Sequence, residues 1–205
     1  MNLRRTAILL ATCLTAVSPS LFAAADGSRL QLPEGAQVGI VVFEDLQCPD
    51  CARAHPELLR VAASEKVPVV IHDFPITRHA WAFPAAVLAR WFGAHSQALE
   101  AEFRSAVFQH QPDITPDNLR EFGEQFAAQH QLQLPPDVDP DGRLAAAVQG
   151  DFDLGRQIGL EYVPLVFVVG RGKDASQWVE VTELEKLSAA IADMRKRRPG
   201  VGSGQ

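Results

Sequence analysis

Two cysteines three positions apart, where a predicted strand passes into a predicted helix, constrain this chain most strongly. Residues 38–43 form a short β-branched run that is typical of a buried strand. Pro49, between Cys48 and Cys51, suits the first position of a helix, where its missing N–H costs no hydrogen bond. The pattern therefore predicts a strand, a cysteine pair at the start of a helix, and a helix that continues to about residue 64.

The predicted helix start favours reactive sulfur chemistry at Cys48. Unpaired N–H groups and the helix dipole at an N-terminus stabilise an anion, so the pKa of Cys48 is expected to be lowered. Cys51 is expected to stay protonated and to resolve a mixed disulfide by attacking Cys48. The sequence thus predicts a redox-active Cys48–Cys51 disulfide, with Pro49 and Asp50 as its intervening dipeptide.

A zinc site and an inert disulfide account less well for the cysteine pair. A structural zinc site needs four ligands, and the chain has no second cysteine pair. His55 follows Cys51 by four residues on one helix face, but Pro56 comes directly after it, which favours a packing role. An inert disulfide closing so small a loop would stabilise the fold little. No metal and no cofactor are predicted.

The N-terminal residues 1–25 have the features of a secretory signal peptide. Arg4 and Arg5 precede an apolar stretch that is too short to span a bilayer, and small residues lead up to Ala25. Cleavage near Ala25 is expected, with no stable membrane insertion afterwards and a periplasmic or otherwise exported location. A lipidated Cys13 is the alternative, although Thr12 before it is unfavourable.

Export changes how the cysteines are interpreted. The chain has three cysteines, and removal of the signal peptide with Cys13 leaves only the pair, in a compartment where disulfides persist.

The length of 205 residues suits one domain, with or without an insertion. The formal charge of −6 argues against a nucleic-acid partner.

The remaining hydrophobic patterns predict a mixed α/β order. A second buried strand is expected at 67–72, and helical stripes then run through 78–131, with Thr115 capping the last of these helices. After a proline-rich loop, we expect a helix at 143–158, strands at 165–169 and 177–181, and a helix at 183–194. Thr182 and Glu185 are expected to form a capping box for that last helix.

A resemblance to a known family rests on four segments together. Residues 43–51 resemble the active-site segment of the DsbA-like branch of the thioredoxin superfamily, which favours proline after the first cysteine. The other matches are Pro56 at the kink of the first helix, residues 72–76 with His79 following, and Val163-Pro164 as the cis-proline loop. The resemblance as a whole extends over nearly all of the chain after the signal peptide.

The resemblance implies a thioredoxin-like fold, a βαβ half plus a ββα half, with an inserted helical domain. The expected division is signal peptide 1–25, N-terminal half 26–77, helical domain 78–140, C-terminal half 141–198 and a disordered tail 199–205. Pro164 is expected to be cis and to face the disulfide, leaving the backbone of Val163 to bind an extended substrate.

The implied activity is disulfide exchange with cysteine-containing exported proteins, more oxidising than reducing, together with a membrane redox partner. Two residues depart from the family pattern: Val42 occupies the place of a buried acid, and Asp50 stands where strongly oxidising members have histidine. A carboxylate there disfavours the thiolate, so a weaker oxidant is expected. Alternatives are a reductase or isomerase, a Cu(I)-binding assembly factor that uses the thiolates, and a peptide-binding module.

Overall fold

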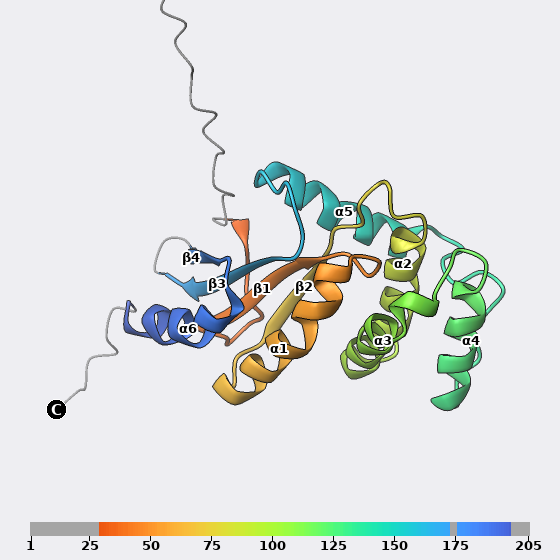
Figure 1. The fold of residues 1–205 in the computed structure, drawn as a ribbon, viewed down its shortest axis with the longest axis horizontal. Coiled ribbons are helices and arrows are strands. Elements are labelled where there is room, and N and C mark those ends of the chain that lie inside the picture. The colour runs from red at the N-terminus through yellow and green to blue at the C-terminus, as the bar shows by residue number, and fades with distance from the viewer. Residues whose placement is uncertain (1–28, 173–175, 198–205) are drawn as a thin grey trace, which may run out of the picture.

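Four strands form one mixed sheet in the order β2-β1-β3-β4 (Figure 1). The computed structural model describes residues 29–172 and 176–197. β1 pairs parallel with β2 and antiparallel with β3, and β3 pairs antiparallel with β4. The strands are β1 (Val38–Glu44), β2 (Val69–Asp73), β3 (Leu165–Arg171) and β4 (Ser176–Val181).

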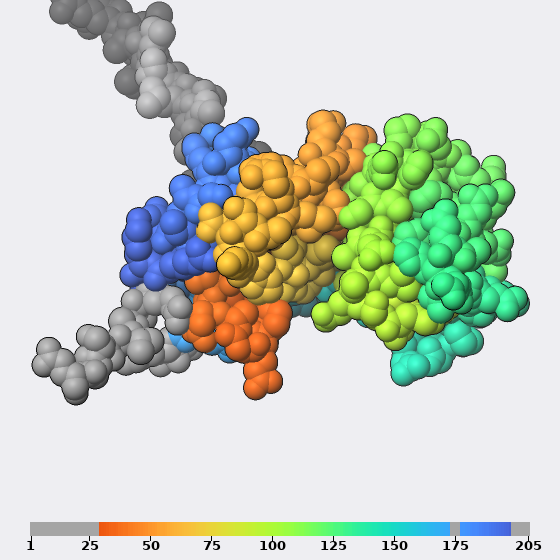
Figure 2. Space-filling view, turned by 90° about the horizontal axis from the view of Figure 1, so that it is seen from below, coloured from red at the N-terminus to blue at the C-terminus, as the bar shows by residue number. Residues whose placement is uncertain are grey.

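The helices lie on both faces and at one end of this sheet. They are α1 (Pro49–Glu65), α2 (Ala82–Gly93), α3 (Gln97–Gln109), η2 (Gln111–Asp113), α4 (Leu119–Gln129), α5 (Arg143–Gln157), η3 (Leu184–Lys186) and α6 (Leu187–Lys196). Figure 1 shows α1 and α6 on one face and α5 on the other. Helices α2–α4 form a lobe at one end, which Figure 2 shows in green beside α1. The predicted fold class, a thioredoxin-like sheet with an inserted helical region, is confirmed.

The alternating side chains of β1 divide the core into two layers. Ile40 and Val42 face α1 and α6, and they pack in a cluster with Leu58 of α1 and Ile191 of α6. Val41, Phe43 and both cysteines belong to the second cluster, which also takes in the apolar faces of α2 and α3. The cysteines, at the start of α1, therefore contribute to the same core cluster as the helical lobe.

β2 differs from the sequence prediction in its burial. The sequence predicts a fully buried strand, but only Asp73 of β2 is buried and the residues from Val69 to His72 are half-buried. The strand order explains the difference, because β2 is an edge strand with no neighbour on its outer side among the described residues. A continuous apolar run does not distinguish an edge strand from a central one.

Two predicted helix caps are wrong. The helix predicted to begin after Thr115 begins at Leu119, and the Thr115 hydroxyl instead accepts from the Asn118 N–H in the preceding turn. The capping box of Thr182 and Glu185 does not form, because a short 3-10 turn precedes α6 and no side chain caps either element. In both places a turn that the sequence pattern does not reveal replaces the first helical turn.

Two predictions fall on residues outside those that the structure describes. They are the signal peptide 1–25 with Cys13 and the tail 199–205. Among the described helices, none combines the length and the apolar character needed to cross a bilayer. The predicted domain limits remain predictions.

Two glycines of α5 offer a matched test of packing against the sheet. A methyl group on buried Gly155 would lie 2.6 Å from Cδ2 of Phe74, whereas one on exposed Gly150 would meet nothing within 4 Å. We expect Gly155→Ala to lower the free energy of unfolding by about 1–3 kcal/mol through overpacking. Gly150→Ala should raise it by about 0.5–1 kcal/mol through helix propensity alone.

Denaturant unfolding of the two variants at one pH measures this difference. The two substitutions are chemically identical and lie on the same helix, so opposite signs isolate the contact with Phe74. Equal effects of the two substitutions on the free energy of unfolding would contradict the close packing of α5 on Phe74, the residue directly after β2.

Candidate active site

The two cysteines lie at the start of α1, directly after the loop that follows β1. Cys48 precedes the helix with extended backbone angles (φ −81°, ψ 120°), and Pro49 and Cys51 belong to the first turn. No side chain caps this end of the helix, so its first N–H groups remain available near the sulfur of Cys48. Both residues are free thiols in the structure, and both are buried.

The two thiols differ strongly in acidity. A hydrogen bond from the Cys51 thiol, aided by the Cys51 backbone N–H, lowers the pKa of Cys48 to about 6, although burial acts in the opposite direction. Burial, and then the hydrogen bond to Cys48, raise the pKa of Cys51 far above its usual range. At neutral pH Cys48 is therefore largely a thiolate, while Cys51 keeps its proton.

A loop distant in sequence faces Cys48. The Val163–Pro164 peptide bond, just before β3, is cis, as the resemblance implies. The Cys48 thiol donates a long hydrogen bond to the carbonyl oxygen of Val163, with 3.8 Å between Sγ and O. Val163 is buried and Pro164 half-buried. The structure thus brings the four residues of the cysteine motif and the predicted substrate-binding pair to one place.

Asp45 fixes the loop that carries the cysteines. Its buried carboxylate accepts hydrogen bonds from the backbone N–H groups of Gln47 and Ile76, both at 2.6 Å, and from Nδ1 of His79 at 2.8 Å. The backbone N–H of Asp45 points at Cys51, 3.4 Å from its sulfur. Because a buried carboxylate is costly without such partners, these bonds hold the loops before α1 and after β2 together.

The helical lobe also contacts the cysteine loop. The side-chain amide of Gln111, in η2, donates to the carbonyl oxygens of Leu46 at 2.8 Å and of Cys48 at 3.1 Å. Sequence reasoning missed Gln111, since a glutamine in a short turn carries no sign of a partner more than 60 residues away. The contact makes the lobe part of the site.

A buried ion-pair network lies beside Cys51. Arg104 of α3 is completely buried and donates to both carboxylate oxygens of Asp73, at 2.8 and 3.1 Å. It also donates to Glu100 at 2.9 Å and to Glu44 at 3.4 Å. The negative charge of Glu44 is among the causes that raise the pKa of Cys51. This network therefore links the lobe, the sheet and the resolving cysteine.

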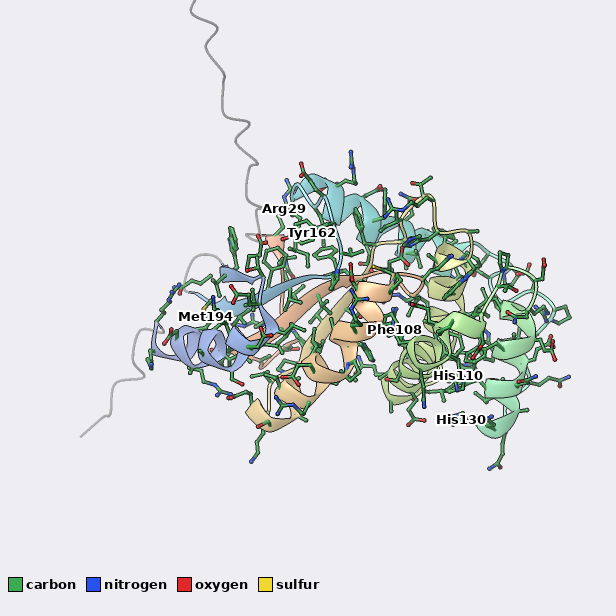
Figure 3. The ribbon with its side chains drawn as sticks, viewed as in Figure 1. Arg29, Phe108, His110, His130, Tyr162 and Met194 are labelled. Atoms are coloured by element: carbon green, nitrogen blue, oxygen red, sulfur yellow. The ribbon has the colours of Figure 1, made fainter. Side chains whose placement is uncertain are left out.

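His55 has a packing role, as the sequence indicates. Its Nε2 lies 2.9 Å from Oγ of Ser105, and its ring lies 4.7 Å from that of Phe108, both residues of α3. Figure 3 labels Phe108. Its Nδ1 lies 3.6 Å from a carboxylate oxygen of Glu44. Within residues 29–172 and 176–197, no three His, Cys, Asp or Glu side chains are grouped so as to hold a metal ion.

The two departures from the family pattern have distinct structural outcomes. Val42 is buried in the cluster between the sheet and the pair α1 and α6, whereas both cysteines belong to the other core cluster. Asp50 is exposed and forms an ion pair with Arg53 one turn later in α1. Its charge is therefore directed toward solvent and toward a cation, and away from the buried sulfurs.

The fold and the paired cysteines at the start of α1 define a protein of the thioredoxin class. The chain belongs to the thioredoxin family, because the family model described as thioredoxin matches residues 33–191. Its form of the fold is the DsbA-like one, in which helices are inserted between the two halves of the thioredoxin unit.

Solved structures with this fold come from several bacteria. The thiol-disulfide exchange protein α-DsbA2 of Wolbachia pipientis is 17% identical, with a TM-score of 0.62 over 79% of this chain and 84% of that one. DsbA2 of Pseudomonas aeruginosa is 18% identical (TM-score 0.57, 85% and 93%). A periplasmic thioredoxin-like protein of Salmonella enterica serovar Typhimurium is 18% identical (TM-score 0.61, 78% and 86%). At sequence identities this low, the similarity of these structures to this chain establishes its fold alone.

One curated relative is similar in sequence to most of this chain. It is the Na(+)/H(+) antiporter NhaA 3 of Salinispora tropica, which is 26% identical over an alignment of 183 residues that covers 85% of this chain. The chain spans only 26% of the length of that relative, so the antiporter's name describes a much larger protein.

Proposed function

We propose that this chain is an exported thiol–disulfide oxidoreductase that exchanges the Cys48–Cys51 disulfide with cysteines of other exported proteins. One observation carries the proposal: the pKa of Cys48 is lowered to about 6 while burial raises that of Cys51. A low pKa makes Cys48 both a ready nucleophile and a good leaving group. The thiol-disulfide exchange named for the Wolbachia protein, on the same fold, supports the proposal.

In the oxidising direction the reaction proceeds in two exchanges. A substrate thiolate attacks Sγ of Cys48, the Cys48–Cys51 bond breaks, and Cys51 leaves with the electron pair and takes up a proton. The substrate's second thiolate then attacks its own first sulfur and displaces Cys48 as a thiolate. The substrate gains a disulfide, and the protein is left as the dithiol with two more electrons.

The backbone at Val163 supplies the wall against which a substrate would lie. Its carbonyl oxygen already faces Sγ of Cys48, and Pro164 has no N–H of its own. An extended substrate segment could therefore pair with the backbone of Val163 while its cysteine reaches Cys48. Regeneration of the disulfide needs a partner that accepts two electrons, for which we propose a membrane oxidase.

Two assays on the chain from residue 26 onward test the proposal. We expect the oxidised protein to form disulfides in a reduced, unfolded substrate, and the reduced protein to accelerate insulin reduction by dithiothreitol. If the rate of disulfide formation exceeds the rate of insulin reduction, the result supports the oxidising direction. If insulin reduction is the faster reaction, the result supports a reductase. Absence of both activities would refute disulfide exchange and leave the peptide-binding alternative.

The reduction potential should lie between those of thioredoxin and DsbA, about −270 and −120 mV. The reason is that a Cys48 pKa of about 6 lies between their nucleophilic cysteines, at about 7 and 3.5. Equilibration with glutathione, followed by separation of oxidised and reduced protein, measures the potential. Asp50→His should move it toward the DsbA value, with Asp50→Asn as the control that removes only the negative charge. A wild-type potential near −120 mV would contradict the weaker-oxidant hypothesis.

A further inference from the structure

The turn that carries Cys48 has a buried backbone acceptor that its own segment does not satisfy. Within the turn, the Cys48 N–H donates to the Asp45 carbonyl at 3.0 Å, and the Gln47 N–H donates to the Asp45 carboxylate at 2.6 Å. The carbonyl of Leu46 lies between them, and Leu46 is only 1% exposed, so water cannot be its partner. Among residues 29–172 and 176–197, the donor that reaches this oxygen is the side-chain amide of Gln111, 2.8 Å away. The turn therefore depends on a residue of the helical lobe.

Gln111 binds the turn and the start of α1 with one group. The nitrogen of its side-chain amide carries two N–H donors, and it lies 2.8 Å from the carbonyl oxygen of Leu46 and 3.1 Å from that of Cys48. The Cys48 carbonyl also accepts from the Ala52 N–H at 3.1 Å, which is the first hydrogen bond of α1. A carbonyl oxygen has two lone pairs and can accept both bonds. Gln111 thus fixes the turn and the first helical turn relative to each other.

The helical lobe holds the same turn at a second point. The side-chain oxygen of Gln47, the residue before Cys48, accepts from the backbone N–H of Trp81 at 2.8 Å. Trp81 is buried and directly precedes α2, whereas Gln111 lies in η2, after α3. Because hydrogen bonds fix direction as well as distance, contacts from two parts of the lobe restrict the backbone that carries the Cys48 sulfur. That sulfur faces the carbonyl oxygen of Val163 at 3.8 Å.

We propose that Gln111 is a positioning residue, through which the helical lobe holds the backbone of the cysteine turn and keeps the Cys48 sulfur in reach of Cys51. This inference deepens the proposed function and rests on it for its biological meaning. The hydrogen bond from the Cys51 thiol is the largest cause that lowers the pKa of Cys48, and such a bond weakens steeply when its partners are misaligned. The lobe therefore contributes to the reactivity of the thiol as well as to the shape of the site.

A thiolate titration of the reduced protein tests the inference without any substrate. Gln111→Met keeps the approximate length of the side chain and removes both donors, while Gln111→Asn keeps the amide and shortens its reach by one methylene. Ultraviolet absorbance follows thiolate formation at Cys48 as pH is raised. We expect the Cys48 pKa to rise by about 0.5–1 in both variants, which is about three- to tenfold less thiolate below the pKa, the ratio expected when one hydrogen bond is weakened.

Gln109→Met is the matched control. Gln109 is the exposed last residue of α3, two positions before Gln111, and its side chain makes no hydrogen bond to the part of the chain that the structure describes. The same substitution there should leave the titration of Cys48 as in the wild type. A control that shifts the Cys48 pKa as much as Gln111→Met does would overturn the inference, because the effect would not come from the contact with the turn.

The outcomes separate positioning from a merely structural role. If both Gln111 variants titrate as the wild type does and only the urea midpoint falls, Gln111 supports the fold alone and the inference is overturned. Should Gln111→Met fail to fold, Gln111→Asn decides by the same titration. Glutathione equilibration gives a second readout, since a less stable Cys48 thiolate should make the reduction potential more negative. A wild type that fails both exchange assays refutes the proposed function, while the titration still decides the role of Gln111.

Discussion

Cys48→Ser is expected to abolish disulfide exchange, with a loss of at least about 10³-fold in the rate of substrate oxidation. The hydroxyl of serine does not ionise near neutral pH, so the group that attacks and leaves is lost. The fold should remain, because the two side chains are nearly the same size and the hydrogen bond from the Cys48 thiol to Val163 is long. The exchange assays measure the loss, and thermal unfolding confirms the intact fold.

Cys51→Ala provides the matched comparison, since it removes the resolving thiol and keeps the nucleophile. Cys48 should still attack a substrate disulfide, but the mixed disulfide should then accumulate and be visible on a non-reducing gel. The pKa of Cys48 should rise above 6, because the hydrogen bond from Cys51 is the largest cause of its lowering. If Cys48→Ser kept both exchange and client binding, the cysteines would be incidental and the chain a peptide-binding module.

The strand–helix order of the fold was predictable because it depends on local pattern. The β-branched run before Cys48, Pro49 at a helix start and the apolar spacing of α2 and α3 each fix a nearby structure. The edge position of β2 was not predictable in this way, since it depends on which strands pair. The caps at Thr115 and Thr182 failed for a related reason, because a turn and a helical first turn require similar residues.

The candidate site was predictable only in part. The cysteines and Val163-Pro164 carry a recognisable pattern, whereas Asp45, His79 and Gln111 act through contacts between segments distant in sequence. A weak indication existed for Arg104: it is a charged residue next to Phe103 in the apolar stripe of α3. An ionisable residue within a buried stripe suggests a buried partner, but the pattern does not identify Asp73 as that partner.

Arg104→Leu is expected to be the most destabilising of these substitutions, lowering the free energy of unfolding by about 3–5 kcal/mol. Leucine would fit an apolar setting, but it would leave the carboxylates of Asp73 and Glu44 buried without their cation. Both acids have side chains at most 4% exposed, so water cannot replace the lost partner. Arg90 still donates to Asp73 at 2.7 Å, which compensates only part of the loss.

The pH dependence identifies the cause of this destabilisation. Burial alone would raise the pKa of Asp73, but Arg104, and then Arg90, outweigh it and hold that pKa below its usual value. In the wild type this ion pair stabilises the fold above the unfolded-state pKa and loses its effect as pH falls through the lowered one. Without Arg104, burial raises the pKa of Asp73, so falling pH neutralises the stranded acid and relieves the penalty. The difference between wild type and variant should therefore narrow from pH 7 toward pH 5.

Urea unfolding of both proteins at the two pH values measures this effect, with Arg120→Leu as the control. Arg120 is about half exposed, pairs with Glu124 at 2.9 Å on α4 and donates to the exposed carbonyl oxygens of Pro135 and Pro136, so its loss should cost less than the loss of buried Arg104. A deficit for Arg104→Leu that is equally small, or that does not change with pH, would show that packing alone holds the helical lobe against the sheet. A large, acid-relieved deficit would show that the ion-pair network holds it there, and with it the contact of Gln111 to the cysteine loop.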